Sequence, residues 1–180
     1  MLFNLWTLFL LTLVAAAVLE QRGSAGLLIA DIKNLTMQTI ILEAKVLKIN
    51  THNAARKGAR VAPALEDLAA ANIKAGDDCL RAPTDPFPDP VALEVIKQLR
   101  RYQHVNQKLM KTLIAKREIL DAFSLAIFSG LAGVQNNWNS FESEDCIDAG
   151  LIPTRTDEAL EIHAAFDLDI AEALNVYIPP

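Results

Sequence analysis

The chain has 180 residues, of which 52% are hydrophobic and only 6% aromatic, and its formal net charge is −5. This length suggests one domain with room for a sizeable core. Aliphatic residues and alanine carry the apolar excess, which favours helices over a β-sandwich. The negative charge argues against nucleic acid as a partner, because proteins of that class present basic surfaces.

The first seventeen residues, MLFNLWTLFLLTLVAAA, contain no charged side chain. A hydrophobic centre at Leu8–Val14 followed by three alanines is typical of a signal peptide cut after Ala17, although no Lys or Arg precedes it. A membrane anchor is the alternative, but the run is shorter than the roughly 20 residues that a span needs. We predict a signal peptide at 1–17 and one secreted domain at 18–180, without a transmembrane anchor in the mature chain.

Two further features fit an extracellular protein. Cys79 and Cys146 are the only cysteines, and in an oxidising compartment they would form one disulfide, although two buried thiols are the alternative. Asn34-Leu35-Thr36 is a glycosylation sequon, and three-residue matches of this kind also occur by chance. Asn34 lies off the apolar stripe of its helix, so a glycan there would face water.

Apolar periodicity predicts two helices in the first half of the chain. The first covers residues 27–50, with an apolar stripe at spacings of three, four or seven, and ends at polar turn residues. A loop rich in Lys and Arg follows. The second helix has Pro63 in its first turn and continues to Cys79. Four prolines between Pro83 and Pro90 then predict an extended loop.

Three helices are expected in the second half. Asp89 followed by Pro90 is a strong start signal, an N-cap and a proline in the first turn. Periodicity alone would continue this helix past Phe123, but so long a helix without caps is unusual. We therefore place a break between Lys116 and Ser124. The fourth helix would reach about Phe141. The fifth would begin near Thr154 or Thr156 and end at Tyr177.

Five helices with short connections predict an all-α, up-and-down bundle. In this topology the second and fourth helices run in the same direction, so Cys79 and Cys146 would lie at the same end. Closing that loop would stabilise the fold by roughly 4 kcal/mol in the chain-entropy model. If the third helix were unbroken, the helices that end near Cys79 and Cys146 would run in opposite directions, and the pairing would be harder.

The sequence offers little catalytic chemistry. Its three histidines form no recognisable metal-ligand motif, and the pair His163 and Asp167 is better explained as a surface pair one turn apart. The glycines Gly130 and Gly133 lie in an apolar helix, where glycine more often permits close packing. We expect a non-enzymatic protein without a metal or cofactor; an enzyme with dispersed residues is the least favoured alternative.

Charge and apolar residues are unevenly distributed. The third helix is basic and the C-terminal stretch is acidic, which is explained either by two solvated, partly complementary faces or by a surface for a carboxylate or anionic lipid head. Apolar residues between Ile119 and Val134 cannot share one side of a helix. That helix is either buried all round, or one side meets a ligand or a hydrophobic surface.

The sequence from about Leu27 to Tyr177 resembles the fungal hydrophobic surface-binding proteins and the related cell-wall galactomannoproteins. The resemblance rests on Ala/Leu-rich amphipathic helices, a long third helix, the segment from Lys116-Arg117 to Phe123, and a last helix ending in Tyr177. It implies a non-enzymatic glycoprotein that adsorbs to hydrophobic surfaces or binds fatty acids inside a helical bundle. The Ser/Thr-rich stalk of some wall-bound members is absent.

We therefore expect a monomeric, secreted, possible cell-wall protein that binds a fatty acid, another lipid or a hydrophobic surface. The alternative is a structural cell-wall mannoprotein with a filled core and no ligand. The expected cavity lining consists of Leu42, Val46, Leu99, Tyr102, Leu109, Leu113, Phe128, Leu131, Phe166 and Ile170. Burying a fatty tail there would contribute roughly 0.8 kcal/mol per methylene group.

Overall fold

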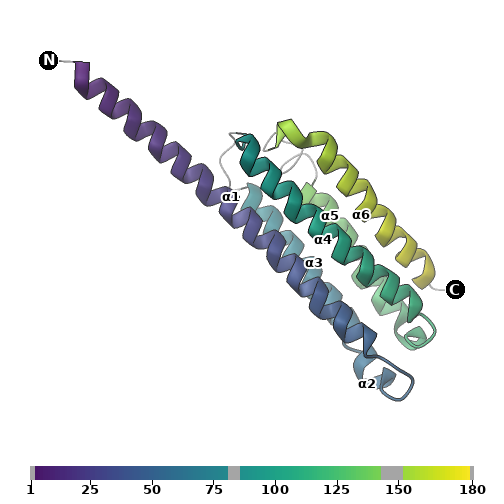
Figure 1. Ribbon diagram of the computed structural model, residues 1–180. Coiled ribbons are helices and arrows are strands. Elements are labelled where there is room, and N and C mark those ends of the chain that lie inside the picture. The colour runs from purple at the N-terminus through teal and green to yellow at the C-terminus, as the bar shows by residue number, and fades with distance from the viewer. Residues whose placement is uncertain (1–2, 81–85, 143–151, 179–180) are drawn as a thin grey trace.

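The computed structural model describes residues 3–80, 86–142 and 152–178, and the described part is an all-helical, up-and-down bundle (Figure 1). Five long helices make up the bundle. In chain order they are α1 (Phe3–Leu47), α3 (Val61–Leu80), α4 (Asp89–Ala115), α5 (Ser124–Glu142) and α6 (Thr156–Tyr177). A short helix α2 (Ala54–Gly58) and two 3₁₀ turns, η1 (Asp121–Phe123) and η3 (Pro153–Arg155), lie in the connections. The predicted fold class is thereby confirmed.

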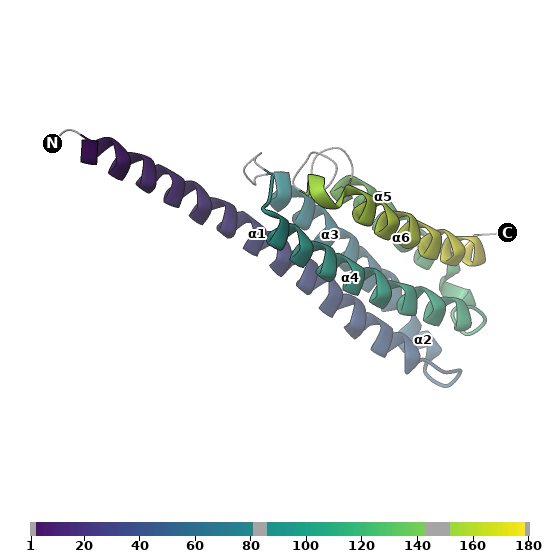
Figure 2. The same cartoon turned by 45° about the horizontal axis from the view of Figure 1, so that its top comes forward.

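The helices form two layers (Figures 1 and 2). α1, α4 and α6 lie side by side in one layer and run in the same direction, with α4 in the middle. α3 and α5 form the second layer and run in the opposite direction. α1 packs on α3 at one edge and α5 packs on α6 at the other, so the apolar stripes meet between the layers.

The predicted break of the long third helix is confirmed. α4 ends at Ala115, and η1 leads into α5 at Ser124. Two basic side chains hold this turn: Lys116 Nζ donates to the carbonyl oxygen of Ile49 at 2.8 Å, and Arg117 Nε donates to that of Val176, also at 2.8 Å. The break is thus stabilised by tertiary hydrogen bonds to the ends of α1 and α6, which periodicity does not report.

Three local expectations were wrong. The first helix does not begin at Leu27, because α1 is continuous from Phe3; residues 18–26 contain no proline, and isolated glycines only weaken a helix. The basic loop after it contains α2. Asp89 is not the N-cap of α4, since that position is Pro88 and no side chain caps the helix. The Asp89 carboxylate instead accepts hydrogen bonds from Arg155 and Thr154, each at 3.1 Å.

The core is aliphatic with a few large aromatic side chains. The predicted stripe of α3 is buried, as are Phe166, Ile170 and Tyr177 on α6. α5 is not buried all round, because Leu125 is 67% exposed and Phe128 only partly buried. One of the two explanations offered for its excess of apolar residues therefore does not hold.

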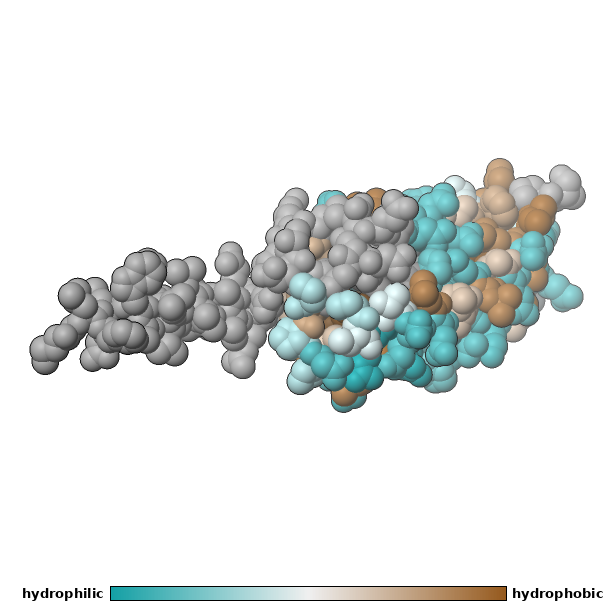
Figure 3. Space-filling view, turned by 90° about the horizontal axis from the view of Figure 1, so that it is seen from above, coloured by the Kyte–Doolittle hydropathy of each residue, from teal (hydrophilic) through white to brown (hydrophobic). Residues whose placement is uncertain are grey.

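The outer face of α1 is unusually apolar. Met37, Ile40, Ile41 and Leu47 are all exposed there, and Asn34 of the sequon is exposed on the same helix. By length and composition alone, Ala25–Leu47 could cross a membrane. In the bundle, however, its other face is buried against α3 and α4. On the face seen in Figure 3, hydrophobic residues lie in small groups among hydrophilic ones.

Candidate functional site

Nine of the ten residues expected to line a cavity are buried in the core, and Phe128 packs against it. Tyr102 and Phe166 belong to an aromatic cluster with Trp138, in which the ring centroids lie 5.5 Å apart for Tyr102 and Trp138, 5.3 Å for Tyr102 and Phe166, and 4.2 Å for Trp138 and Phe166. These rings fill the space where α4, α5 and α6 meet. The role of the ten residues in ligand binding stays a prediction.

Polar side chains are also buried in this core. Tyr102 Oη donates to Asn72 Oδ1 at 3.4 Å, and Asn72 Nδ2 donates to the Leu68 carbonyl at 3.1 Å. Burial raises the pKa of Tyr102 above its ordinary value. Asn106, one turn further along α4, is fully buried, and its amide atoms have no hydrogen-bond partner among the described residues. The sequence analysis did not anticipate that Asn106 would be buried.

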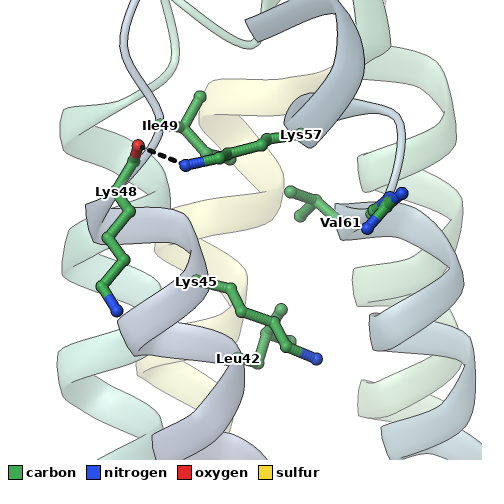
Figure 4. Close-up of a pocket in the computed structure, with 7 residues that line it drawn as sticks. Leu42, Lys45, Lys48, Ile49, Lys57 and Val61 are labelled. Atoms are coloured by element: carbon green, nitrogen blue, oxygen red, sulfur yellow. Dashed lines mark hydrogen bonds between the residues drawn. The ribbon is translucent and has the colours of Figure 1, made fainter. Parts of the chain in front are cut away.

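A pocket lies at the end of the bundle where α1, α2 and α3 meet (Figure 4). Its volume is about 290 Å³, near the lower end of the range usual for ligand pockets. Leu42, Ile49 and Val61 form its apolar floor, and each is at most 3% exposed. In Figure 4, Leu42 extends from α1 and Val61 from the start of α3 toward the space between the two helices.

Four basic residues complete the lining: Lys45 and Lys48 from α1, Lys57 from α2, and Arg60 just before α3. Lys45 extends across the opening beside Leu42, and Lys57 reaches over its top toward the Lys48 carbonyl oxygen, 3.5 Å from its Nζ (Figure 4). Within the described parts of the chain, none of the four forms an ion pair. Elsewhere Lys74, Arg100 and Arg155 pair with carboxylates, whereas the exposed Lys97, Lys108 and Lys111 of α4, like the four pocket residues, have no ion pair with a described residue.

Of the ten predicted lining residues, Leu42 is the one that also lines this pocket. The four basic residues were missed as site residues, although the sequence carries a signal for them. Between Glu43 and Glu66 there are five basic residues, Lys45, Lys48, Arg56, Lys57 and Arg60, and no Asp or Glu. This local positive charge stands out in a chain with a net charge of −5.

The basic face of α4 and the acidic α6 are partly complementary. Arg100 Nη2 lies 3.0 Å from Glu158 Oε2 and 3.9 Å from Glu161 Oε2, and Gln103 and Gln107 donate to the buried Asp169. These contacts agree with the interpretation of the two charged faces as solvated and complementary. His163 Nε2 lies 3.1 Å from Asp167 Oδ2, one turn further along α6.

No group of three or more His, Cys, Asp or Glu residues that could hold a metal ion occurs among the residues that the structure describes. Cys79 is buried in the last turn of α3. Because α3 and α5 run in the same direction (Figure 1), the parity required for the predicted pairing is present. Cys146 lies outside the described residues, so the pairing itself stays a prediction.

The fold and the pocket define a two-layer helical bundle with an apolar, basic-rimmed pocket at one end. Comparison with solved structures gives the same fold for the Aspergillus fumigatus mannoprotein Afmp4p, which was solved in complex with palmitic acid. The TM-score is 0.76 at 13% sequence identity, over 85% of this chain and 99% of that one. No protein-family model and no curated protein sequence matches the chain. The likeness to a fungal mannoprotein is therefore one of fold.

Proposed function

We propose that this chain is a secreted, non-enzymatic protein that binds a hydrophobic ligand of the fatty-acid or lipid class. The observation that carries the proposal is the apolar pocket at one end of the bundle, in a fold shared with a protein solved with palmitic acid. The buried floor of Leu42, Ile49 and Val61 supports apolar binding, because an acyl chain on it would lose contact with water. The other nine predicted lining residues are packed in or against the core, which favours this end pocket over the bundle centre.

A displacement titration tests this proposal. The lipid-stripped protein is loaded with a fluorescent fatty acid and titrated with palmitic acid. We expect saturable loading and full displacement, with unlabelled chains of increasing length competing progressively better because each buried methylene group contributes roughly 0.8 kcal/mol. A protein that loads no probe and binds no palmitic acid would instead favour the structural cell-wall protein with a filled core.

Adsorption to a hydrophobic surface is a second candidate, and a specific observation favours it. The exposed side chains Met37, Ile40, Ile41 and Leu47 form an apolar row on the outer face of α1. Exposed apolar side chains arranged in this way lower the solubility of a protein unless a partner or a surface covers them. Replacing Met37 and Ile41 by lysine should abolish retention on hydrophobic beads, while Leu125→Lys and Leu168→Lys, at exposed positions of α5 and α6, should have little effect. Equal retention of both double variants would count against this function.

We also propose that the protein is extracellular. The apolar N-terminal run supports a signal peptide cleaved after Ala17, and the exposure of Asn34 is compatible with a glycan. Cys79 would pair with Cys146. Peptide mapping of the secreted, non-reduced protein tests all three features: we expect an N-terminus at Val18, a glycosidase-sensitive mass at Asn34 and a Cys79–Cys146 crosslinked peptide. An unmodified Asn34 or alkylated thiols would remove the corresponding feature.

A further inference from the structure

The pocket at the α1–α2–α3 end has a charge pattern that an apolar ligand does not explain. Its floor is apolar, but the basic residues Lys45, Lys57 and Arg60 also line it, whereas the side chain of Lys48 extends away from the opening (Figure 4). Part of this charge has a structural role, since cations near the C-terminus of α1 interact favourably with the helix dipole. Lys57 contributes in this way through the carbonyl oxygen of Lys48. Lys45 and Arg60 have no ion pair with a described residue.

The connection that carries these cations is held in place by specific contacts. Asn53 Nδ2 donates to the Lys48 carbonyl at 3.1 Å, and its Oδ1 accepts from the backbone N–H of Asn50, also at 3.1 Å. Gly58 of α2 packs so closely on the α4–α5 turn that an added Cβ would lie 2.6 Å from a ring carbon of Phe123. The backbone that carries Lys57 and Arg60 is therefore held in place on the bundle, so that only their side chains need to be ordered when a ligand binds.

We propose that this end pocket binds an anionic, single-chain amphiphile by its head. The head lies among Lys45, Lys57 and Arg60, and the first part of the chain covers Leu42, Ile49 and Val61. The inference rests on the proposed function of hydrophobic-ligand binding and adds to it a place on the fold and a charge for the ligand. Cationic groups that have no carboxylate partner in the protein gain charge-assisted hydrogen bonds from a carboxylate or a phosphate, whereas a neutral head would gain none.

Binding of four matched compounds to the lipid-stripped protein tests the charge requirement. They are a fatty acid, the lysophosphatidic acid with the same chain, the corresponding fatty alcohol, and inorganic phosphate. We expect the two acids to bind at least about tenfold more tightly than the alcohol, with a preference that weakens as salt is added. The ratio of the two acids tells which anionic head is preferred. Equal affinity of acid and alcohol overturns the inference, as does phosphate binding as tightly as the two acids.

A charge-matched pair of triple variants tests the location. The first variant replaces Lys45, Lys57 and Arg60 by glutamine. The control replaces the exposed Lys97, Lys108 and Lys111 of α4 by glutamine. We expect the first to lose roughly tenfold in affinity for the acids and little for the alcohol, and the control to match the unaltered protein. If both variants bind the acids equally, the inference fails while the proposed function stands. If no amphiphile binds the unaltered protein, both fail.

A readout on the unaltered protein makes the test independent of the variants. Methyl NMR signals of Leu42, Ile49 and Val61 should shift on titration with the fatty acid, while those of Leu99 and Ile170 in the bundle core should remain nearly unchanged. Shifts confined to the core methyl groups would place the ligand between the layers and overturn the inference.

Discussion

Gly130 of α5 lies directly against Leu65 of α3, so that a Cβ added at Gly130 would be 2.8 Å from the Cβ of Leu65. Gly133, one turn further along, has more room, because its added Cβ would lie 3.6 Å from the Cβ of Ala69, an ordinary contact. The two glycines therefore allow different helix separations. Gly130 determines how closely α3 and α5 approach, as glycine in an apolar helix was expected to do.

This difference predicts opposite effects of the same substitution. Gly130→Ala should lower the free energy of unfolding by about 1–3 kcal/mol, since the helices must move apart or Leu65 must shift. Gly133→Ala should raise it by up to about 1 kcal/mol, because alanine favours the helix and meets no clash. Urea unfolding of the two variants measures both values. Equal effects would mean that the contact with Leu65 does not limit the spacing.

The buried amides Asn106 and Asn72 should also respond differently to leucine. Asn106→Leu should raise the free energy of unfolding by about 1 kcal/mol or more, because it removes buried amide atoms without partners. Asn72→Leu should lower it by about 1 kcal/mol, because Tyr102 loses its acceptor. Thermal and urea unfolding provide the comparison. A strongly destabilised Asn106→Leu protein would show that this side chain has a partner in solution.

Arg117 should be the more important residue of the basic pair in the α4–α5 turn. Its Nε donates to Val176, its guanidinium pairs with Asp121, and its Cζ lies 5.4 Å from the ring centroid of Tyr177. We expect Arg117→Ala to destabilise the fold by about 1–2 kcal/mol. The control Arg101→Ala, at an exposed position of α4, should stay within about 0.5 kcal/mol. Indistinguishable unfolding curves would mean that Arg117 does not stabilise the turn.

Alkaline pH should unfold the protein through its two tyrosines. Burial raises the pKa of Tyr177 from 10.0 to about 12 and raises that of Tyr102 as well. The neutral phenols therefore favour the folded state fully below pH 10, the ordinary pKa, and this contribution is lost as the pH rises from there toward 12. Phenolate absorbance followed together with helical circular dichroism checks this. Phenolate should appear only as helix is lost, and its appearance near pH 10 in an intact fold would contradict the assignment.

Sequence reasoning predicted the helices well where one apolar stripe defines each of them. α3 and α6 follow their stripes. The break after Ala115 also gave the correct helix directions, with α3 and α5 ending at the same end of the bundle. The N-cap at Asp89 was wrong because Arg155, distant in sequence, binds that carboxylate. Local patterns do not record such partners.

The end pocket could be anticipated only in part. A run of five basic residues without an acidic one was visible between Glu43 and Glu66. Lys45 and Arg60 flank the same apolar floor because α2 folds back on the α4–α5 turn, where Gly58 contacts Phe123. The sequence pattern does not show this contact. Likewise, Trp138 lay in a polar stretch of sequence, and its burial against Phe166 depends on the packing of α5 on α6.

The claim that this protein binds an anionic lipid is tested most simply by mass spectrometry of the lipids extracted from the natively purified protein. We expect a fatty acid or another single-chain acidic lipid in near-stoichiometric amount, reduced in the triple variant of Lys45, Lys57 and Arg60 and unchanged in the Lys97, Lys108 and Lys111 control. A protein that carries no lipid and takes up none when it is offered in solution would contradict the claim.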